Sequence, residues 1–250
     1  MEKGISLSTK SIIKSFDEET KLEIKKMQEE IKNYSLQVPN FNDNITNLSL
    51  TEEQIYALKG YTGLNFKKIN SLLRKIWNYE ELGIKTELDE KKIQADIALI
   101  DEIISYFPES MEPFITYRGT TIDAFKQYNI ESIEELNNLN GKFLYEEAYT
   151  STSLDENKSY YNKNIYGTVT NIEIKYIVPP HFNDGIPLTT SNLSYSPNLQ
   201  EYLIGRNALS KVIKVETKIK TAIITVILIP KKIWDKKEKN KEMIYKKSYI

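Results

Sequence analysis

The hydrophobic pattern of the sequence changes at Pro113, and this change limits the possible folds more than any other feature. Before Pro113, apolar residues recur every three or four positions, which is the spacing of one face of an α-helix. After it, short runs rich in Ile, Val, Tyr and Thr predominate, which is typical of β-strands. Helices that lead and strands that follow favour an α+β fold with a mixed, mainly antiparallel sheet over a doubly wound parallel sheet. We therefore expect a helical N-terminal half packed on a β core.

The beginning of the chain is expected to form an extension. An amphipathic helical pattern runs from Ser8 to about Tyr34, and an Asn-rich connector, residues 37–47, follows it. We therefore assign residues 1–47 to an N-terminal amphipathic helical extension and residues 48–250 to the main domain.

The main domain is expected to begin with three helices. Thr51 and Gln54 have the spacing of a capping box, which marks a helix start. A second helix follows Gly63, and a third covers residues 89–106. The elements expected after Pro113 are, in order, strand 114–120, helices 121–128 and 130–136, and strands 143–153, 167–178, 201–204, 211–219, 221–230 and 242–250.

Composition excludes several classes of function. The chain has no cysteine and a single histidine, so it lacks disulfides, thiolate nucleophiles and a Ser-His-Asp triad unless His181 serves. Its 34 Lys and Arg residues balance 35 Asp and Glu residues, which gives no reason to expect a nucleic acid partner. No Rossmann or P-loop motif occurs. Carboxylates, hydroxyls, Arg and Tyr remain for any chemistry.

The sequence shows no visible signal peptide or transmembrane span. Residues 1–30 are heavily charged. The longest apolar run, residues 222–230, is far shorter than the roughly 20 residues that a membrane-spanning helix needs. We therefore expect a soluble chain.

Three short features stand in a fixed order in the strand half. Tyr117-Arg118-Gly119 ends the first expected strand, and Tyr149-Thr150-Ser151-Thr152-Ser153 lies in the next. Glu201 stands where a polar loop, residues 194–200, meets a short apolar strand, so strand hydrogen bonds can hold it while it stays open to a ligand. Aromatic-Arg, then Ser-Thr-Ser, then Glu resembles the bacterial mono-ADP-ribosyltransferase toxins of the Arg-Ser-Glu class. These include the enzymatic components of clostridial binary toxins and the Rho-modifying exoenzymes.

The helical half is similar to the same family. Tyr61-Thr62-Gly63, Phe66, Ile69-Asn70 and Leu73-Arg74 resemble the helix and loop that cover NAD in those enzymes. The resemblance covers about residues 50–230. It implies an ADP-ribosyltransferase-like fold with a two-sheet β core, and it makes residues 48–250 the catalytic domain.

The resemblance implies an enzyme that cleaves the nicotinamide–ribose bond of NAD and transfers ADP-ribose to a protein, without a metal. Glu201 would stabilise the positive charge that develops on the ribose. Ser151 would hold Glu201 by hydrogen bonding, and Arg118 would meet the phosphates with its planar fork. The residues implied for NAD binding are Tyr61, Phe66, Asn70, Arg74, Tyr117, Arg118, Ser153, Tyr161 or its neighbour Tyr160, and Lys163.

One position departs from the family pattern. Two residues before the catalytic Glu the family usually carries Glu or Gln, which engages the acceptor, whereas this chain has Leu199. Gln200 is adjacent to Glu201, and adjacent side chains of an extended strand point to opposite faces, so Gln200 cannot substitute unless the backbone bulges. Tyr195 could be an exposed anchor for the acceptor. We therefore assign acceptor recognition to Tyr195, Leu199 and Gln200.

Three activities stay open from the sequence. The chain is a mono-ADP-ribosyltransferase with an unusual acceptor, an NAD glycohydrolase, or an inactive binding or docking domain. Leu199 supports the inactive alternative, and the intact Arg118, Ser151 and Glu201 oppose it. The resemblance implies a host acceptor protein, such as actin or a small GTPase, a possible separate cell-binding or translocation component, and secretion or delivery into a host cell.

Overall fold

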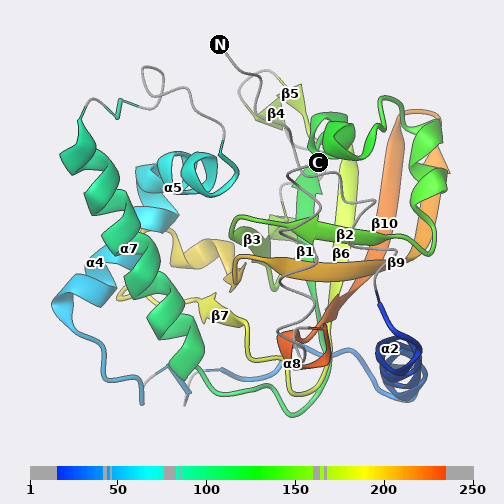
Figure 1. Ribbon diagram of the computed structural model, residues 1–250, viewed down its shortest axis with the longest axis horizontal. Helices are drawn as coiled ribbons and strands as arrows, with labels where there is room; N and C mark the ends of the chain where they lie inside the picture. The colour runs from blue at the N-terminus through cyan, green and yellow to red at the C-terminus, as the bar shows by residue number, and fades with distance from the viewer. Residues whose placement is uncertain are drawn as a thin grey trace.

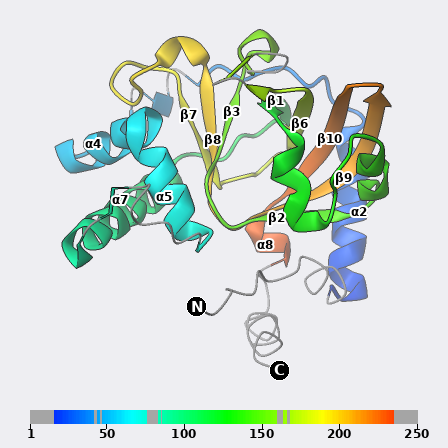
Figure 2. The same cartoon turned by 90° about the horizontal axis from the view of Figure 1, so that it is seen from above.

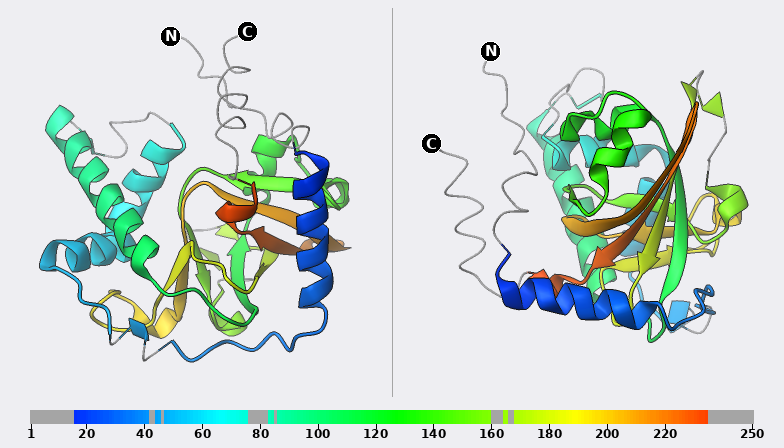
Figure 3. Two further views of the ribbon diagram at one scale, coloured as in Figure 1. Left: turned by 60° about the horizontal axis from the view of Figure 1, so that its bottom comes forward. Right: turned by 90° about the vertical axis from the view of Figure 1, so that its right-hand side faces the viewer.

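The chain folds into a helical layer on one side of a curved β-sheet, as the computed structural model shows (Figure 1). The structure describes residues 16–41, 44–45, 47–75, 83–84, 86–159, 164–165 and 168–234. Helices α4 (Glu52–Gly60), α5 (Phe66–Leu73) and α7 (Glu87–Tyr106) form the helical layer. Helix α2 (Glu18–Ile31) lies at the opposite side of the sheet, beside the short α8 (Lys231–Trp234) (Figure 3). The expected α+β class is confirmed.

Eight strands form one sheet in the order β2-β9-β10-β6-β1-β3-β8-β7. All neighbours in it are antiparallel except β6 and β10, which run parallel, so the expected mixed, mainly antiparallel sheet is confirmed. A separate two-stranded sheet pairs β4 with β5. The strands are β1 (Phe114–Thr120), β2 (Phe143–Glu146), β3 (Thr150–Ser153), β4 (Asn164–Ile165), β5 (Thr168–Val169), β6 (Ile172–Val178), β7 (Gly185–Leu188), β8 (Glu201–Ile204), β9 (Ala208–Lys218) and β10 (Thr221–Ile229).

The core is therefore one connected sheet where the sequence led us to expect two. Five strands, β2-β9-β10-β6-β1, and three strands, β3-β8-β7, are joined through the pairing of β1 with β3. That pairing consists of the single register pair Tyr117↔Ser153, whereas β1 and β6 pair over seven residues. The narrow junction joins the two groups of strands into a single hydrogen-bonded sheet.

Local signals explain where the helices begin. Thr51 and Gln54 form the expected capping box at the start of α4, and Thr86 and Asp89 form another at the start of α7. Between α4 and α5, a π-helical turn, Tyr61–Asn65, contains Gly63 with non-helical φ −96° and ψ −111°. The two helices are thus kinked against each other at this glycine. No helix in the described part of the chain combines the length and apolar character that crossing a bilayer requires.

The main core lies between the helical layer and the sheet. Ile100 and Ile103 of α7 are fully buried in it together with Phe114 of β1 and Leu203 of β8. Burial of such a side chain contributes about 1.5–3 kcal/mol, so this layer holds the helices firmly against the strands. A separate cluster buries Ile24, Met27 and Ile31 of α2 against Leu209, Ile227 and Ile229 of the sheet.

Several expected elements differ from the observed ones. The expected strand 143–153 is two strands, because β2 pairs with β9 and β3 pairs with β8, and the chain crosses between these partners. The expected helices 121–128 and 130–136 are 3₁₀ segments, η2 (Ile122–Tyr128) and η3 (Glu134–Leu139). Strand β7 was not expected, since it contains Pro187; it lies at the sheet edge, where proline is tolerated. The expected strand 242–250 lies outside the described residues.

Candidate active site

A cleft of about 710 Å³ lies between the π-helical turn and the junction of the sheet. Its lining includes Arg118 from β1, Ser151 from β3 and Glu201 from β8. These strands are neighbours, and the register pairs Tyr117↔Ser153 and Ser153↔Glu201 place the three sequence motifs in one row. Segments more than 80 positions apart in the sequence therefore meet at one place, the point where the two groups of strands join.

Arg118 is fixed by a backbone contact across the junction. Its Nη1 donates a 2.8 Å hydrogen bond to the carbonyl oxygen of Ser151. The remaining N–H groups of the planar guanidinium leave it suited to bind an anionic ligand with charge-assisted hydrogen bonds. The backbone of Ser151 therefore also positions Arg118.

Glu201 is the first residue of β8 and is half-buried. Burial raises the pKa of its carboxyl group, while a hydrogen bond from Ser151 and the positive charge of Arg118 act in the lowering direction. A carboxylate held in such a poorly solvated place interacts strongly with any positive charge that forms beside it. The arrangement can therefore stabilise a cationic transition state.

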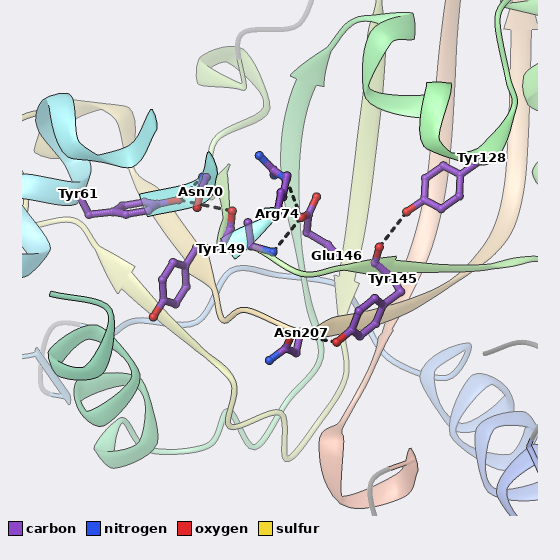
Figure 4. Close-up of polar contacts among 9 residues, drawn as sticks. Tyr61, Asn70, Arg74, Tyr128, Tyr145, Glu146, Tyr149 and Asn207 are labelled. Atoms are coloured by element: carbon purple, nitrogen blue, oxygen red, sulfur yellow. Dashed lines mark hydrogen bonds and ion pairs between the residues drawn. The ribbon is translucent and has the colours of Figure 1, made fainter. Parts of the chain in front are cut away.

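The hydroxyl of Tyr61 lies beneath this row of residues. The ring is buried and packs edge-on against Tyr149 at a centroid distance of 5.5 Å. Asn70 Nδ2 donates a 3.1 Å hydrogen bond to the Tyr61 hydroxyl, and Figure 4 shows the two side chains meeting. Burial raises the pKa of Tyr61 to about 12, against hydrogen bonds to Ser151 and Asn70. Tyr61 therefore presents its hydroxyl edge, and not an open ring face, to the cleft.

Arg74 lies away from the cleft. Its Nε is 3.0 Å from Glu146 Oε1 of β2 (Figure 4), and both residues line a neighbouring cavity of about 380 Å³. Arg118 lines this cavity as well as the cleft. The expected NAD-binding pair Asn70 and Arg74 is thus divided: Asn70 reaches Tyr61 at the cleft, and Arg74 faces the second cavity.

The loop before Glu201 does not continue the strand. Pro197–Leu199 form a 3₁₀ turn, and Gln200 follows with φ 51° in the left-handed region. The alternation of adjacent side chains in an extended strand therefore does not apply to Gln200, and it does not prevent Gln200 from substituting for a polar residue at position 199. Ser153 Oγ donates a 2.8 Å hydrogen bond to the Leu199 carbonyl, so the Ser-Thr-Ser strand also fixes this loop. Leu199 lines the cleft.

Tyr195 lies on the surface near the entrance. Its backbone N–H donates a 3.1 Å hydrogen bond to the Thr62 hydroxyl, and its ring lies close to Gly63. Of the remaining expected residues, Phe66, Tyr117 and Ser153 line the cleft. Tyr160, Tyr161 and Lys163 lie outside the described residues.

Two further lining residues were not expected from the sequence. Lys158, the last residue of the 3₁₀ turn η4 (Glu156–Lys158), and Ser159, which follows it, border the cleft. Asp155 caps this turn by accepting a hydrogen bond from the backbone N–H of Asn157. The Ser159 carbonyl accepts a hydrogen bond from Gly119 N–H, which ties this turn to the Arg motif. The Asp-Glu-Asn sequence of residues 155–157 is a turn signal that could have placed Lys158 there in advance.

The described residues contain no group of three or more His, Asp and Glu side chains placed to hold a metal ion. The polar groups of the cleft are instead a guanidinium, a carboxylate, an ammonium and several hydroxyls. Such a set suits a ligand with phosphates and ribose hydroxyls.

Comparisons with known proteins agree with the geometry of the cleft. Residues 25–244 match the family described as ADP-ribosyltransferase exoenzyme. The fold is similar to that of C3stau2 from S. aureus, solved with NAD, with a TM-score of 0.59 and 20% identity over 76% of this chain and 92% of that chain. An ADP-ribosyltransferase from Clostridium botulinum gives a TM-score of 0.58 and 22% identity over 75% of this chain and 91% of that chain.

A larger toxin component shares the fold. The enzymatic component of the C2 toxin from Clostridium botulinum gives a TM-score of 0.54 and 21% identity, and the match covers 76% of this chain and 46% of that chain. At these identities the solved structures establish the fold. No curated protein matches the sequence.

Proposed function

The chain belongs to the ADP-ribosyltransferase exoenzyme family, and we propose that Arg118, Ser151 and Glu201 form the active site with which it acts on NAD. Membership makes the protein an NAD-dependent mono-ADP-ribosyltransferase of the bacterial toxin type, whose substrate is NAD and whose acceptor is a host protein. One observation supports the assignment of the site above all others: three motifs that are far apart in the sequence line one cleft at the junction of the sheet.

The proposed chemistry follows from the charges in the cleft. When the bond between nicotinamide and ribose breaks, nicotinamide leaves as a neutral base and positive charge develops on the ribose. The Glu201 carboxylate stabilises that charge more strongly in the transition state than in the ground state, which is the requirement for catalysis. An acceptor side chain then bonds to the ribose carbon and gives up a proton. Ser151 holds Glu201, and Arg118 holds the phosphates.

NAD binding draws on the residues around these three. We propose that Phe66 and Tyr117 offer ring surfaces to the bases, that Ser153 and the Tyr61 hydroxyl contribute hydrogen bonds, and that Lys158 lies near a phosphate. The family pattern also assigns Asn70, Arg74, Tyr161 and Lys163 to NAD. The Asn70 Oδ1 atom is buried and has no hydrogen-bond partner in the described part of the chain, which supports its assignment. Arg74 would have to exchange Glu146 for a phosphate.

The acceptor is the less defined part of the proposal. We assign its recognition to Tyr195, Leu199 and Gln200, with actin or a small GTPase as the acceptor by resemblance. Leu199 lines the cleft and has no polar group with which to orient an arginine or asparagine side chain. Gln200 follows the 3₁₀ turn in a left-handed conformation and is the polar residue of this loop that lies next to Glu201. A Gln200 that engages the acceptor would account for transfer in spite of Leu199.

We also propose the extent of the domains and the site of action. Residues 48–250 form the catalytic domain, and residues 1–47 form an extension whose helix α2 packs on the sheet remote from the cleft. The protein acts inside a host cell after secretion or direct delivery, either alone or with a separate cell-binding or translocation component.

Release of nicotinamide from NAD tests the proposed site. Wild type and Glu201→Gln are compared with and without a host-cell lysate, while labelled ADP-ribose is followed on the lysate proteins. We expect wild type to release nicotinamide and to label a protein, and Glu201→Gln to do neither. Release without a labelled protein would indicate a glycohydrolase. No turnover by wild type, with intact binding of NAD, would leave the inactive docking domain as the remaining alternative.

A further inference from the structure

Large apolar side chains are exposed beside the entrance of the cleft. Leu64 of the π-helical turn is 87% exposed, Tyr195 of the loop before β8 is 63% exposed, and Phe66 at the start of α5 is 39% exposed. Phe66 also lines the cleft itself, so the exposed apolar surface and the cleft are continuous. The loop before β8 lies beside α4 and α5 when the molecule is seen from above (Figure 2).

Specific contacts bring the two segments together. The backbone N–H of Tyr195 donates to the Thr62 hydroxyl at 3.1 Å, and a Cβ at Gly63 would lie 3.0 Å from the Tyr195 ring. Lys59 Nζ lies 5.9 Å from the centroid of the same ring. Tyr195 therefore packs on the helical layer, and this contact is possible because Gly63 has no side chain. The π-helical turn and the loop of residues 194–200 therefore form one surface.

These exposed apolar side chains add almost nothing to the stability of the folded chain. A leucine that is 87% exposed contributes almost no burial, and the turn that carries it interrupts the regular α-helical hydrogen bonding between α4 and α5. Exposed apolar groups that gather at one place mark sites of interaction with another molecule. The same turn supplies Tyr61 and Thr62 to the cleft, which ties the exposed surface to the reaction site.

The position of this surface beside the cleft entrance indicates which molecule binds to it. We propose that Leu64, Tyr195 and Lys59 form a docking surface for the acceptor protein, and that the acceptor presents an apolar patch with a carboxylate beside it. This inference rests on the proposed function and extends acceptor recognition from the loop before Glu201 to the helical layer. An acceptor side chain must enter the cleft to reach Glu201, so the body of the acceptor covers the adjoining entrance. Lys59 supplies a positive charge at the edge, which a partner carboxylate complements.

A substitution of Leu64 separates docking from chemistry. Leu64→Asp places a charge on the surface without disturbing a packed side chain, since Leu64 is exposed. Ile219→Asp is the matched control: Ile219 is 89% exposed and follows β9, outside the residues that line the cleft. Two rates are measured for each variant: nicotinamide release from NAD in buffer alone, and transfer of labelled ADP-ribose to purified actin, to a purified Rho-type GTPase and to proteins of a host-cell lysate.

We expect Leu64→Asp to lower the transfer rate at least tenfold and to leave nicotinamide release in buffer within twofold of wild type. Ile219→Asp should change neither rate. A second variant, Lys59→Glu, should lower transfer several-fold at low ionic strength, and this difference should shrink at 0.5 M salt because screening weakens it. Wild-type transfer by both Leu64→Asp and Lys59→Glu would overturn the docking surface and leave the proposed function intact.

Two other outcomes also decide against the proposal. If wild type transfers no ADP-ribose to any of these proteins, the docking surface fails together with the transferase function. If wild type sediments as a dimer, Leu64→Asp sediments as a monomer and transfer is unchanged, the surface is covered by a second copy of this chain. Sedimentation of both proteins in the same buffer distinguishes the last case.

Discussion

Two regions of the molecule hold a carboxylate that is at least half-buried near positive charges, and they differ in how these charges are paired. In the cleft, Glu201 has no ion-pair partner within 4.0 Å among the described residues, although Arg118 lies close enough to affect its pKa. Near the C-terminal end of β8, a cavity of about 390 Å³ is lined by Asp184, which is 2.9 Å from Lys231 Nζ, and by Asp101, which is 2.7 Å from Arg206. We call this second region the paired cluster.

The difference separates chemistry from structure. In the paired cluster each carboxylate has a cation beside it. Asp101 also accepts a 2.6 Å hydrogen bond from the Tyr149 hydroxyl, and Lys231 binds Asp184 Oδ1, although the buried Asp184 Oδ2 has no partner among the described residues. In the cleft, Arg118 donates to a backbone carbonyl and not to Glu201, so both charges remain available to a ligand. Burial raises the pKa of both Glu201 and Asp184. A raised pKa therefore does not identify the reactive group here; the available partners do.

The largest effect should come from the same change made at both carboxylates. Glu201→Gln should lower nicotinamide release about 10²–10³-fold, the loss typical when a group that stabilises transition-state charge is removed. Asp184→Asn should leave the rate within a few-fold of wild type, because Asp184 does not line the cleft. Steady-state assays on both purified proteins, with circular dichroism to verify folding, measure the difference. Equal losses in the two variants would mean that the comparison of the regions is wrong.

The next largest difference should be in the KM for NAD, between variants of Arg118 and of Arg206. Arg118→Lys removes the planar fork from the cleft and should raise KM for NAD about 10–100-fold, since a lysine binds phosphate only as a point charge. Arg206→Lys should leave KM unchanged, because Arg206 is engaged with Asp101 in the paired cluster. Initial rates over a range of NAD concentrations separate KM from kcat. A KM for Arg118→Lys that equals the wild-type value would remove Arg118 from NAD binding.

Local patterns in the sequence predicted much of this arrangement. The strand limits 114–120 and 201–204 are correct, because each strand is a short apolar run between turn residues. The capping box at Thr51 is correct, because its hydrogen bonds join residues only three apart. The family resemblance that the three motifs carry implied that they share one site, and the sheet brings them together through neighbouring strands.

The remaining features depend on contacts between distant segments. Asn70 and Arg74 have the spacing of one helix stripe, but the position of Arg74 is decided by Glu146, which lies 72 residues away on β2. The paired cluster joins Asp101 of α7 to Arg206 across 105 residues, and no local pattern marks it. The contact of Tyr195 with Gly63 depends on the close approach of two distant segments, in which the hydrogen-bonded residues Thr62 and Tyr195 are 133 positions apart. Spacing within one segment cannot predict such pairs.

The paired cluster should matter for stability more than for rate. Asp101→Ala removes the acceptor that the Tyr149 hydroxyl and the half-exposed Arg206 share, but the Tyr149 hydroxyl can still donate to the Ile97 carbonyl, which is 3.0 Å away. We therefore expect a loss of only about 1 kcal/mol in the free energy of unfolding. A loss of that size lowers the Tm by about 2–4 °C in a domain of this length. Thermal unfolding followed by circular dichroism measures it, with exposed Glu216→Gln as the control; an unchanged Tm would show that the cluster contributes little.

The smallest predicted effect is the loss of folding stability that the charge of Glu201 causes. Because folding raises the pKa of Glu201 above its unfolded value, the folded protein disfavours the charged form. The cost is therefore present at pH 8, where the group is ionised, and disappears as the pH falls below about 4, where it is protonated in both states. Glu201→Gln has no such charge, so its Tm should be higher than that of wild type at pH 8.

The gain should vanish at pH 4, and Glu216→Gln should change the Tm by less than about 1 °C at either pH, as is usual for a surface substitution. Differential scanning calorimetry of the three proteins at both pH values measures these differences. A Tm of Glu201→Gln that is lower than the wild-type Tm at pH 8 would mean that Ser151 and Arg118 stabilise the carboxylate by more than its burial costs. Glu201 would then differ from Asp184, whose carboxyl pKa is raised by burial although Lys231 Nζ lies 2.9 Å away.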